Sequence, residues 1–108
     1  MSTNLKEILE LKEEIDKLSQ ALLAKASQVG GDVLFKRSHP EIRKIWNNLC
    51  KAHMKAMVVC IDRAPQDSKM ATLCDEIERP RACIEALHLS EEETCCGRFM
   101  NRMKESKA

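Results

Sequence analysis

The sequence predicts an all-α protein, a compact bundle of about five helices that opens with a long amphipathic helix. Aromatic residues make up only 3% of the 108 residues, whereas β-sheets draw heavily on aromatic and β-branched side chains. Only three Gly and three Pro interrupt the chain, which favours long helices joined by few turns. The length indicates one domain, with residues 1–29 as the first helix and residues 38–104 as the helical core.

A heptad pattern runs along the predicted helix 1–29. Its apolar residues alternate between spacings of three and four, as at the a and d positions of a coiled coil. These residues are Ile8, Leu11, Ile15, Leu18 and Leu22. We predict that they form a self-association seam and that the protein is a homodimer. The alternative is that the seam packs on the rest of its own domain, because any amphipathic helix shows a similar stripe.

Capping signals place the second helix. Residues 30–37 are expected to form a connector whose apolar side chains enter the core: Val33, Leu34 and Phe35. Ser38 is the predicted N-cap, Glu41 completes a capping box three residues later, and Pro40 fits the first turn. We expect this helix to continue to about Asp62.

Three shorter helices complete the predicted bundle. The first begins at Asp67 or Ser68 and ends near residue 78, and the second spans about 80–88 after Pro80. Ser90 and Glu93 form a further capping box, which predicts a last helix to about residue 104.

A basic block occupies the middle of the chain. The net charge is −2 over residues 1–35, +5 over residues 36–63 and −2 over residues 64–108, and +1 in total. On the predicted second helix four basic or amide residues fall within about 40° of one line: Lys44, Asn48, Lys51 and Lys55. We predict that they bind an acidic protein partner. A nucleic-acid backbone is the alternative partner, and a merely solvated face is the simplest interpretation.

Six cysteines are many for this length. The first residues do not form the apolar run of a secretory signal, so we expect a cytoplasmic protein with reduced, buried thiols. A disulfide framework is the alternative. Cys50 and Cys60 enclose nine residues, which resembles one half of the twin nine-spaced cysteine hairpins of the mitochondrial intermembrane space. Cys74 and Cys83 enclose eight, however, with Pro80 between them, so we interpret the spacing as a coincidence.

No set of residues indicates catalysis or a bound metal. Cys50, His53 and Cys60 lie on one face of the second helix and are weak zinc candidates, because a tetrahedral site needs four ligands and no second close pair is present. We find no nucleophile with an oriented base, no paired carboxylates and no phosphate loop. We therefore predict no catalytic residue, no metal and no cofactor.

The combined features predict a small, non-enzymatic, intracellular accessory or regulatory protein, an adaptor or inhibitor that binds another protein. The longest apolar run, residues 56–61, is far shorter than the roughly 20 residues that span a bilayer, so no membrane partner is expected. A nucleic-acid-binding protein and a zinc-stabilised helical module are the second and third alternatives.

Overall fold

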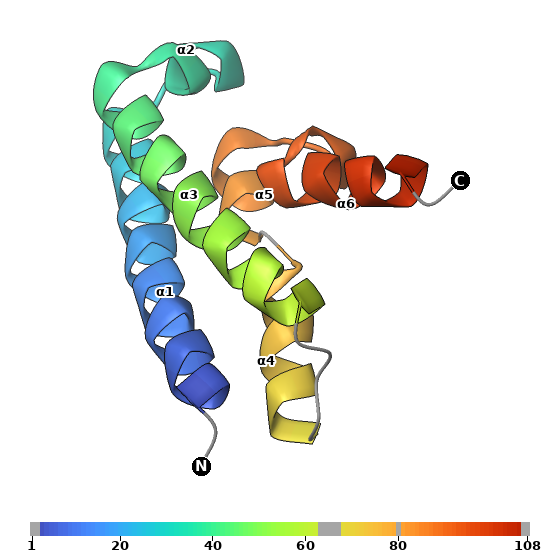
Figure 1. Ribbon diagram of the computed structural model, residues 1–108. Helices are drawn as coiled ribbons and strands as arrows, with labels where there is room; N and C mark the ends of the chain where they lie inside the picture. The colour runs from blue at the N-terminus through green and yellow to red at the C-terminus, as the bar shows by residue number, and fades with distance from the viewer. Residues whose placement is uncertain (1–2, 63–67, 80, 107–108) are drawn as a thin grey trace.

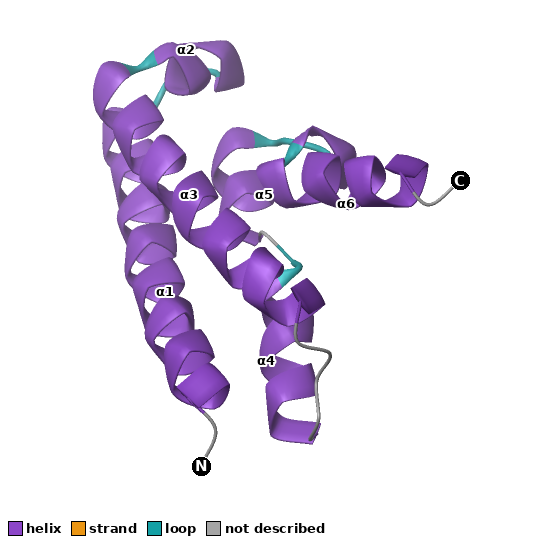
Figure 2. Cartoon of the chain, viewed as in Figure 1, coloured by secondary structure: helices purple, strands orange, loops and turns teal. Residues whose placement is uncertain are grey.

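The computed structural model describes residues 3–62, 68–79 and 81–106. Within these ranges the chain forms helices and no strand (Figure 2). The elements are α1 (Thr3–Val29), α2 (Val33–Ser38), α3 (Pro40–Asp62), α4 (Ser68–Ile77), α5 (Arg81–Leu87), the 3-10 helix η1 (Glu91–Glu93) and α6 (Cys95–Ser106). The predicted all-α class is confirmed, and the five predicted helices correspond to α1, α3, α4, α5 and α6. The predicted cap at Asp67 and start at Pro80 lie outside the described residues.

The long helices α1 and α3 pack side by side, and α2 lies across one end of the pair (Figure 1). Helix α5 packs against α1, α6 packs against α3, and α4 contacts both long helices. The heptad seam of α1 contributes Ile8, Ile15 and Leu22 to the core, and its other two leucines are half-buried against that core. The helices α3, α4 and α5 all contact α1, so the seam is covered within a single chain. The homodimer remains a prediction, and a dimer through these residues would have to open this core.

The connector between α1 and α3 differs from the prediction, because it contains the helix α2. Gly30 closes α1 with a φ of 68°, a conformation that glycine adopts without strain. The Asp32 side chain then accepts a hydrogen bond from the Phe35 backbone N–H at 2.8 Å and starts α2 as its N-cap. This turn directs side chains outward: Leu34 is 75% exposed and Phe35 is 54% exposed. The predicted entry of these two residues into the core is therefore wrong.

Ser38 closes α2 and does not cap α3. Its hydroxyl donates to the backbone oxygens of Leu34 at 3.0 Å and Phe35 at 3.1 Å. The predicted capping box fails because Glu41 pairs with Lys25 of α1. Pro40 nevertheless opens α3, as the sequence predicts.

The predicted capping box near the C-terminal end is present, but it begins η1. Ser90 accepts from the Glu93 backbone N–H, and the Glu93 carboxylate accepts from the Ser90 backbone N–H. The helix α6 starts later, where the Thr94 hydroxyl oxygen accepts from the Gly97 N–H at 3.1 Å. The box is therefore confirmed, and the start of the last helix moves to Cys95.

Two disulfides attach flanking helices to α3. Cys50 is bonded to Cys95 of α6, and Cys60 is bonded to Cys74 of α4, with Cα atoms 5.8 Å and 5.9 Å apart. The prediction of reduced thiols is thus wrong for these four cysteines, because the fold brings together sulfurs that no sequence spacing relates. Cys83 and Cys96 are free and buried.

Candidate functional site

The solvent-facing side of α3 carries the predicted partner-binding residues. Lys44, Asn48, Lys51 and Lys55 are all exposed, and we call these four residues the basic row. The opposite side of the helix is core, as the periodicity predicts, with Ile42, Leu49 and Met57 fully buried. From Lys44 to Lys55 the row extends along about 16 Å of helix. The structure therefore brings the four predicted residues together on one accessible face.

The charge of the basic row is not neutralised within the described part of the chain. None of its lysines forms an ion pair there, whereas three of the four lysines of α1 are paired with carboxylates. Those pairs are Lys12 with Asp16, Lys17 with Glu13, and Lys25 with Glu41. The hydrogen bond from Lys25 lowers the pKa of Glu41 below its ordinary value, so this carboxylate stays charged and engaged. The row remains free to meet an external anion.

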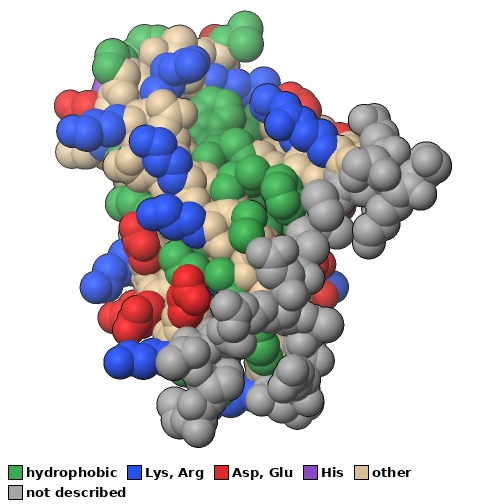
Figure 3. All heavy atoms as spheres, in the orientation of Figure 1, with side chains coloured by type: hydrophobic (Ala, Val, Ile, Leu, Met, Phe, Trp, Pro, Cys, Tyr) green, Lys and Arg blue, Asp and Glu red, His purple; other side chains and the backbone are tan. Residues whose placement is uncertain are grey.

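Apolar surface lies beside the basic row. Val58 falls on the same side of α3, three residues after Lys55, and is 43% exposed. In Figure 3, Lys and Arg side chains gather over α2 and the first half of α3, and hydrophobic side chains occupy the surface between α3 and α6. Most acidic side chains in this view lie lower, over α1. Sequence reasoning missed Val58, although its helical angle already placed it in the polar face.

A second apolar surface is the tip formed by Leu34 and Phe35 on α2. The Phe35 ring packs edge-on against the His39 ring, with centroids 6.2 Å apart. Two ring nitrogens of the described residues are buried without a hydrogen-bond partner among those residues: Nδ1 of His39, which contacts Phe35, and Nε1 of Trp46 in α3. The six residues of α2 are too few to show a helical period.

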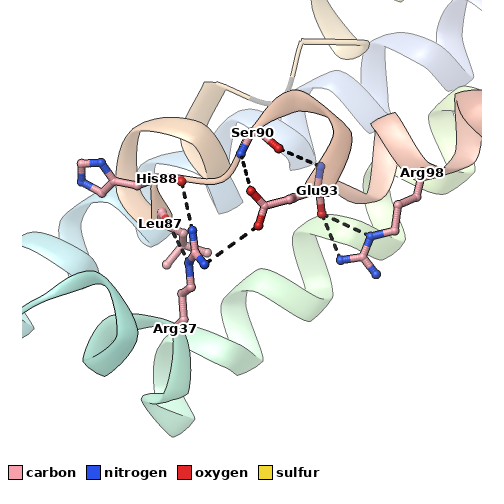
Figure 4. Close-up of polar contacts among 6 residues, drawn as sticks. All are labelled: Arg37, Leu87, His88, Ser90, Glu93 and Arg98. Carbon is pink, nitrogen blue, oxygen red and sulfur yellow. Dashed lines mark hydrogen bonds and ion pairs between the residues drawn. The ribbon is translucent and has the colours of Figure 1, made fainter.

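A network around Arg37 fixes α2 against the segment between α5 and α6 (Figure 4). Arg37 donates to the backbone oxygens of Leu87 and His88, and its guanidinium lies 4.0 Å from the Glu93 carboxylate. Hydrogen bonds from Ser90 are the main cause that lowers the pKa of Glu93. Arg98 donates twice to the Glu93 backbone oxygen, at 3.2 Å and 3.0 Å. These contacts stabilise the fold. Arg37 belongs to the basic block of residues 36–63, so one charge of that block has a structural role.

The weak metal candidates do not form a site. Cys50 and Cys60 are disulfide-bonded, so neither offers the thiolate that zinc binds. His53 is buried in the core. Among the described residues no group of three or more His, Cys, Asp or Glu side chains is arranged to hold a metal ion.

The two free thiols, Cys83 and Cys96, are expected to be unreactive. Burial raises the pKa of Cys83 to about 11. Burial, with smaller contributions from Cys83 and Glu78, raises the pKa of Cys96 to about 12. Both groups therefore stay protonated near neutral pH, whereas a nucleophilic cysteine needs a lowered pKa.

No helix in the described ranges has the length and apolar character needed to cross a membrane. The chain matches no protein-family model, and neither a curated protein nor a solved structure matches it.

Proposed function

We propose that this is a small non-enzymatic accessory or regulatory protein that docks an acidic surface of a protein partner on the basic row. The observation that carries the proposal is the set of three exposed lysines on one face of α3, none of them ion-paired within the described residues. Such a row attracts an oppositely charged partner and speeds its encounter, with an effect that weakens as salt rises.

The apolar contact beside the row favours a protein over a nucleic acid. Val58 offers a dry contact at the edge of the charged face, and protein interfaces combine apolar and charged contacts in this way. A phosphate backbone would use the lysines alone. The net charge of +1 also gives little general attraction for nucleic acid. Nucleic-acid binding remains the second candidate, because the lysines alone would suit it.

Two finer expectations need separate support. The predicted cytoplasmic location conflicts with the two disulfides, because disulfides persist in oxidising compartments and are rare in the cytosol. We propose that the protein functions in an oxidising compartment. The predicted homodimer finds no support in the burial of Ile8, Ile15 and Leu22 within one chain. Light scattering of the purified protein measures the oligomeric state directly.

Charge reversal tests the proposed function. The variant Lys44→Glu, Lys51→Glu, Lys55→Glu reverses the row, and the matched control Lys6→Glu, Lys69→Glu, Arg102→Glu makes the same charge change at exposed positions of α1, α4 and α6. Nuclease-treated extracts of the native host are captured on wild type and on both variants. We expect a partner protein that the control retains and the row variant loses, and that higher salt releases.

Two outcomes would count against the proposal. If both variants capture the same proteins as wild type, the row is only solvated surface. If the purified protein binds a random duplex with a log–log salt slope of about −0.9 per neutralised phosphate, and the row variant alone loses that binding, nucleic acid is the partner. Circular dichroism of each variant confirms that the helices are intact before either conclusion is drawn.

A further inference from the structure

A cleft of about 470 Å³ opens on the side of α3 opposite the basic row. Helices α1, α4 and α5 form most of its walls, together with the segment after α4, and His53 of α3 lines it. This volume falls within the roughly 300–1,000 Å³ of typical small-molecule sites. The functions proposed above leave the cleft unused.

His53 is the buried polar group of this cleft. It is 3% exposed, and no hydrogen bond joins its ring to another described residue. Burial, assisted by the charge of Lys12, lowers the pKa of His53 to about 4. At neutral pH the imidazole is therefore uncharged, with one nitrogen that donates a hydrogen bond and one that accepts.

The charged groups of the lining favour a cation. Beside His53, the single ammonium group of Lys12 lies 2.6 Å from Asp16 and 3.8 Å from Glu76, so two carboxylates share one positive charge. Over the whole lining there are three basic and four acidic side chains, which leaves one negative charge. Arg79 is already occupied by Asp75 at 4.0 Å.

Part of the cleft lining is apolar. Ile15, Leu23, Ile77 and Ala82 contribute hydrocarbon surface. A ligand that matches the site therefore carries an apolar body and a positively charged head. This combination describes an organic ammonium compound.

We propose that the cleft binds a small primary amine with an apolar body. The ammonium group donates hydrogen bonds to the carboxylates of Asp16 and Glu76 and to the accepting nitrogen of His53. The body packs against Ile77 and its apolar neighbours. Because the site depends on neither Val58 nor the basic row, it stands independently of the proposed protein partner.

Paired probes of equal shape and opposite charge test the site. Phenethylamine carries the ammonium head, and 3-phenylpropionate carries a carboxylate on a similar body. Titration calorimetry and the ring resonances of His53 in NMR spectra follow both probes at neutral pH. We expect saturable binding of phenethylamine with a shift of the His53 signals, and weaker binding of 3-phenylpropionate. Equal affinities for the two probes, or the absence of saturable phenethylamine binding, would overturn the proposal.

Rim variants locate the site without disturbing the core. Glu76→Gln removes one carboxylate at an exposed position, and Glu78→Gln is the matched control, because Glu78 is exposed on the same segment and lies outside the cleft lining. We expect Glu76→Gln to weaken phenethylamine binding roughly fivefold, the effect of one nearby charge in a solvated setting, and Glu78→Gln to leave it unchanged. Equal effects of the two variants would mean that the amine binds elsewhere.

The double variant Asp16→Asn, Glu76→Gln gives the strictest test. It leaves Lys12 as an unpaired cation beside His53, so the preference between the probes should invert towards 3-phenylpropionate. A double variant that folds and still prefers phenethylamine would refute the assignment of these two carboxylates. Thermal unfolding of the variant verifies that it is folded.

Discussion

Arg37 Nε donates a hydrogen bond of 2.8 Å to the backbone oxygen of Leu87, a residue fifty positions further along the chain. The same guanidinium donates to the backbone oxygen of His88 at 3.0 Å. The last carbonyl groups of a helix lack intrahelical partners, and here α5 ends at Leu87 while His88 takes a φ of 53°. Arg37 of α2 thus supplies the C-terminal cap of α5.

The first prediction concerns this cap. Arg37→Ala should lower the free energy of unfolding by about 2 kcal/mol, because it leaves carbonyl groups of a part-buried site without their charged donor. Arg37→Lys should recover only part of this loss, since an ammonium group cannot reproduce the two-pronged geometry. Urea denaturation measures both variants. Lys36→Ala on the same helix is the control, and an equal loss there would show that Arg37 is not special.

The second prediction concerns Gly97 in the first turn of α6. A Cβ atom at this position would lie 1.9 Å from the backbone oxygen of Glu91. Gly to Ala within a helix normally stabilises by up to about 1 kcal/mol, but here the new methyl group meets rigid backbone. Gly97→Ala should therefore destabilise, by roughly 1–3 kcal/mol, in thermal or urea unfolding. Asn101→Ala, at an exposed position of α6, should not; if Gly97→Ala stabilises, the close packing of η1 on α6 is incorrect.

Local signals in the sequence were sufficient for the main helices. The heptad of α1, the glycine at its end and the proline that opens α3 all act within a few residues, and the structure places them as predicted. The basic row was predicted for the same reason, because helical period alone decides which residues share a face. The helix α2 was not predicted, because six residues make too few turns to show a helical period. The cap residue Asp32 also follows Gly30 and Gly31, which indicate a turn.

Long-range relationships could not be predicted in this way. The bond between Cys50 and Cys95 joins positions 45 residues apart, and only the docking of α6 on α3 brings them together. The cleft at His53 depends on side chains from four helices, so the sequence could place His53 on the apolar face but not show that the face is hollow there. Reduced thiols were predicted from the absence of a secretory signal. That prediction was wrong for four cysteines, because the signal carries no information on which sulfurs the fold brings into contact.

The third prediction concerns the two disulfides. Protein purified without reductant should have an intact mass four hydrogens below that of the fully reduced chain, since each of the two bonds removes two hydrogens. Peptide mapping should link Cys50 to Cys95 and Cys60 to Cys74. A purified protein with six free thiols, or with other linkages, would contradict the structure.

Removal of each disulfide should lower the free energy of unfolding by an amount that increases with the length of the loop that the disulfide closes. The chain-entropy relation gives a loss of about 4 kcal/mol for the pair Cys50→Ser, Cys95→Ser and about 3 kcal/mol for Cys60→Ser, Cys74→Ser, because these bonds span 45 and 14 residues. Chemical denaturation under non-reducing conditions compares the two. Cys83→Ala is the control, because it alters a buried free thiol and leaves both bonds in place.

The last prediction concerns the pH dependence of stability. Burial, with a smaller effect of Lys12, lowers the pKa of His53 from 6.5 to about 4, so the unfolded chain binds a proton at this residue more readily than the folded protein does. The contribution of neutral His53 to the free energy of unfolding is therefore complete above pH 6.5. This contribution, roughly 3 kcal/mol in total, is lost as the pH falls from 6.5 to about 4. Urea denaturation across this interval measures the slope.

Two variants separate His53 from the other groups that titrate in that interval. His53→Leu should reduce the slope of stability against pH between pH 6.5 and about 4, because it replaces the buried base with an apolar side chain that does not titrate. His88→Asn, the comparison variant, replaces an exposed histidine with a residue that tolerates its positive φ, and the slope should change more in His53→Leu than in this variant. If His53→Leu keeps the full slope, protonation of the buried imidazole does not limit stability in acid.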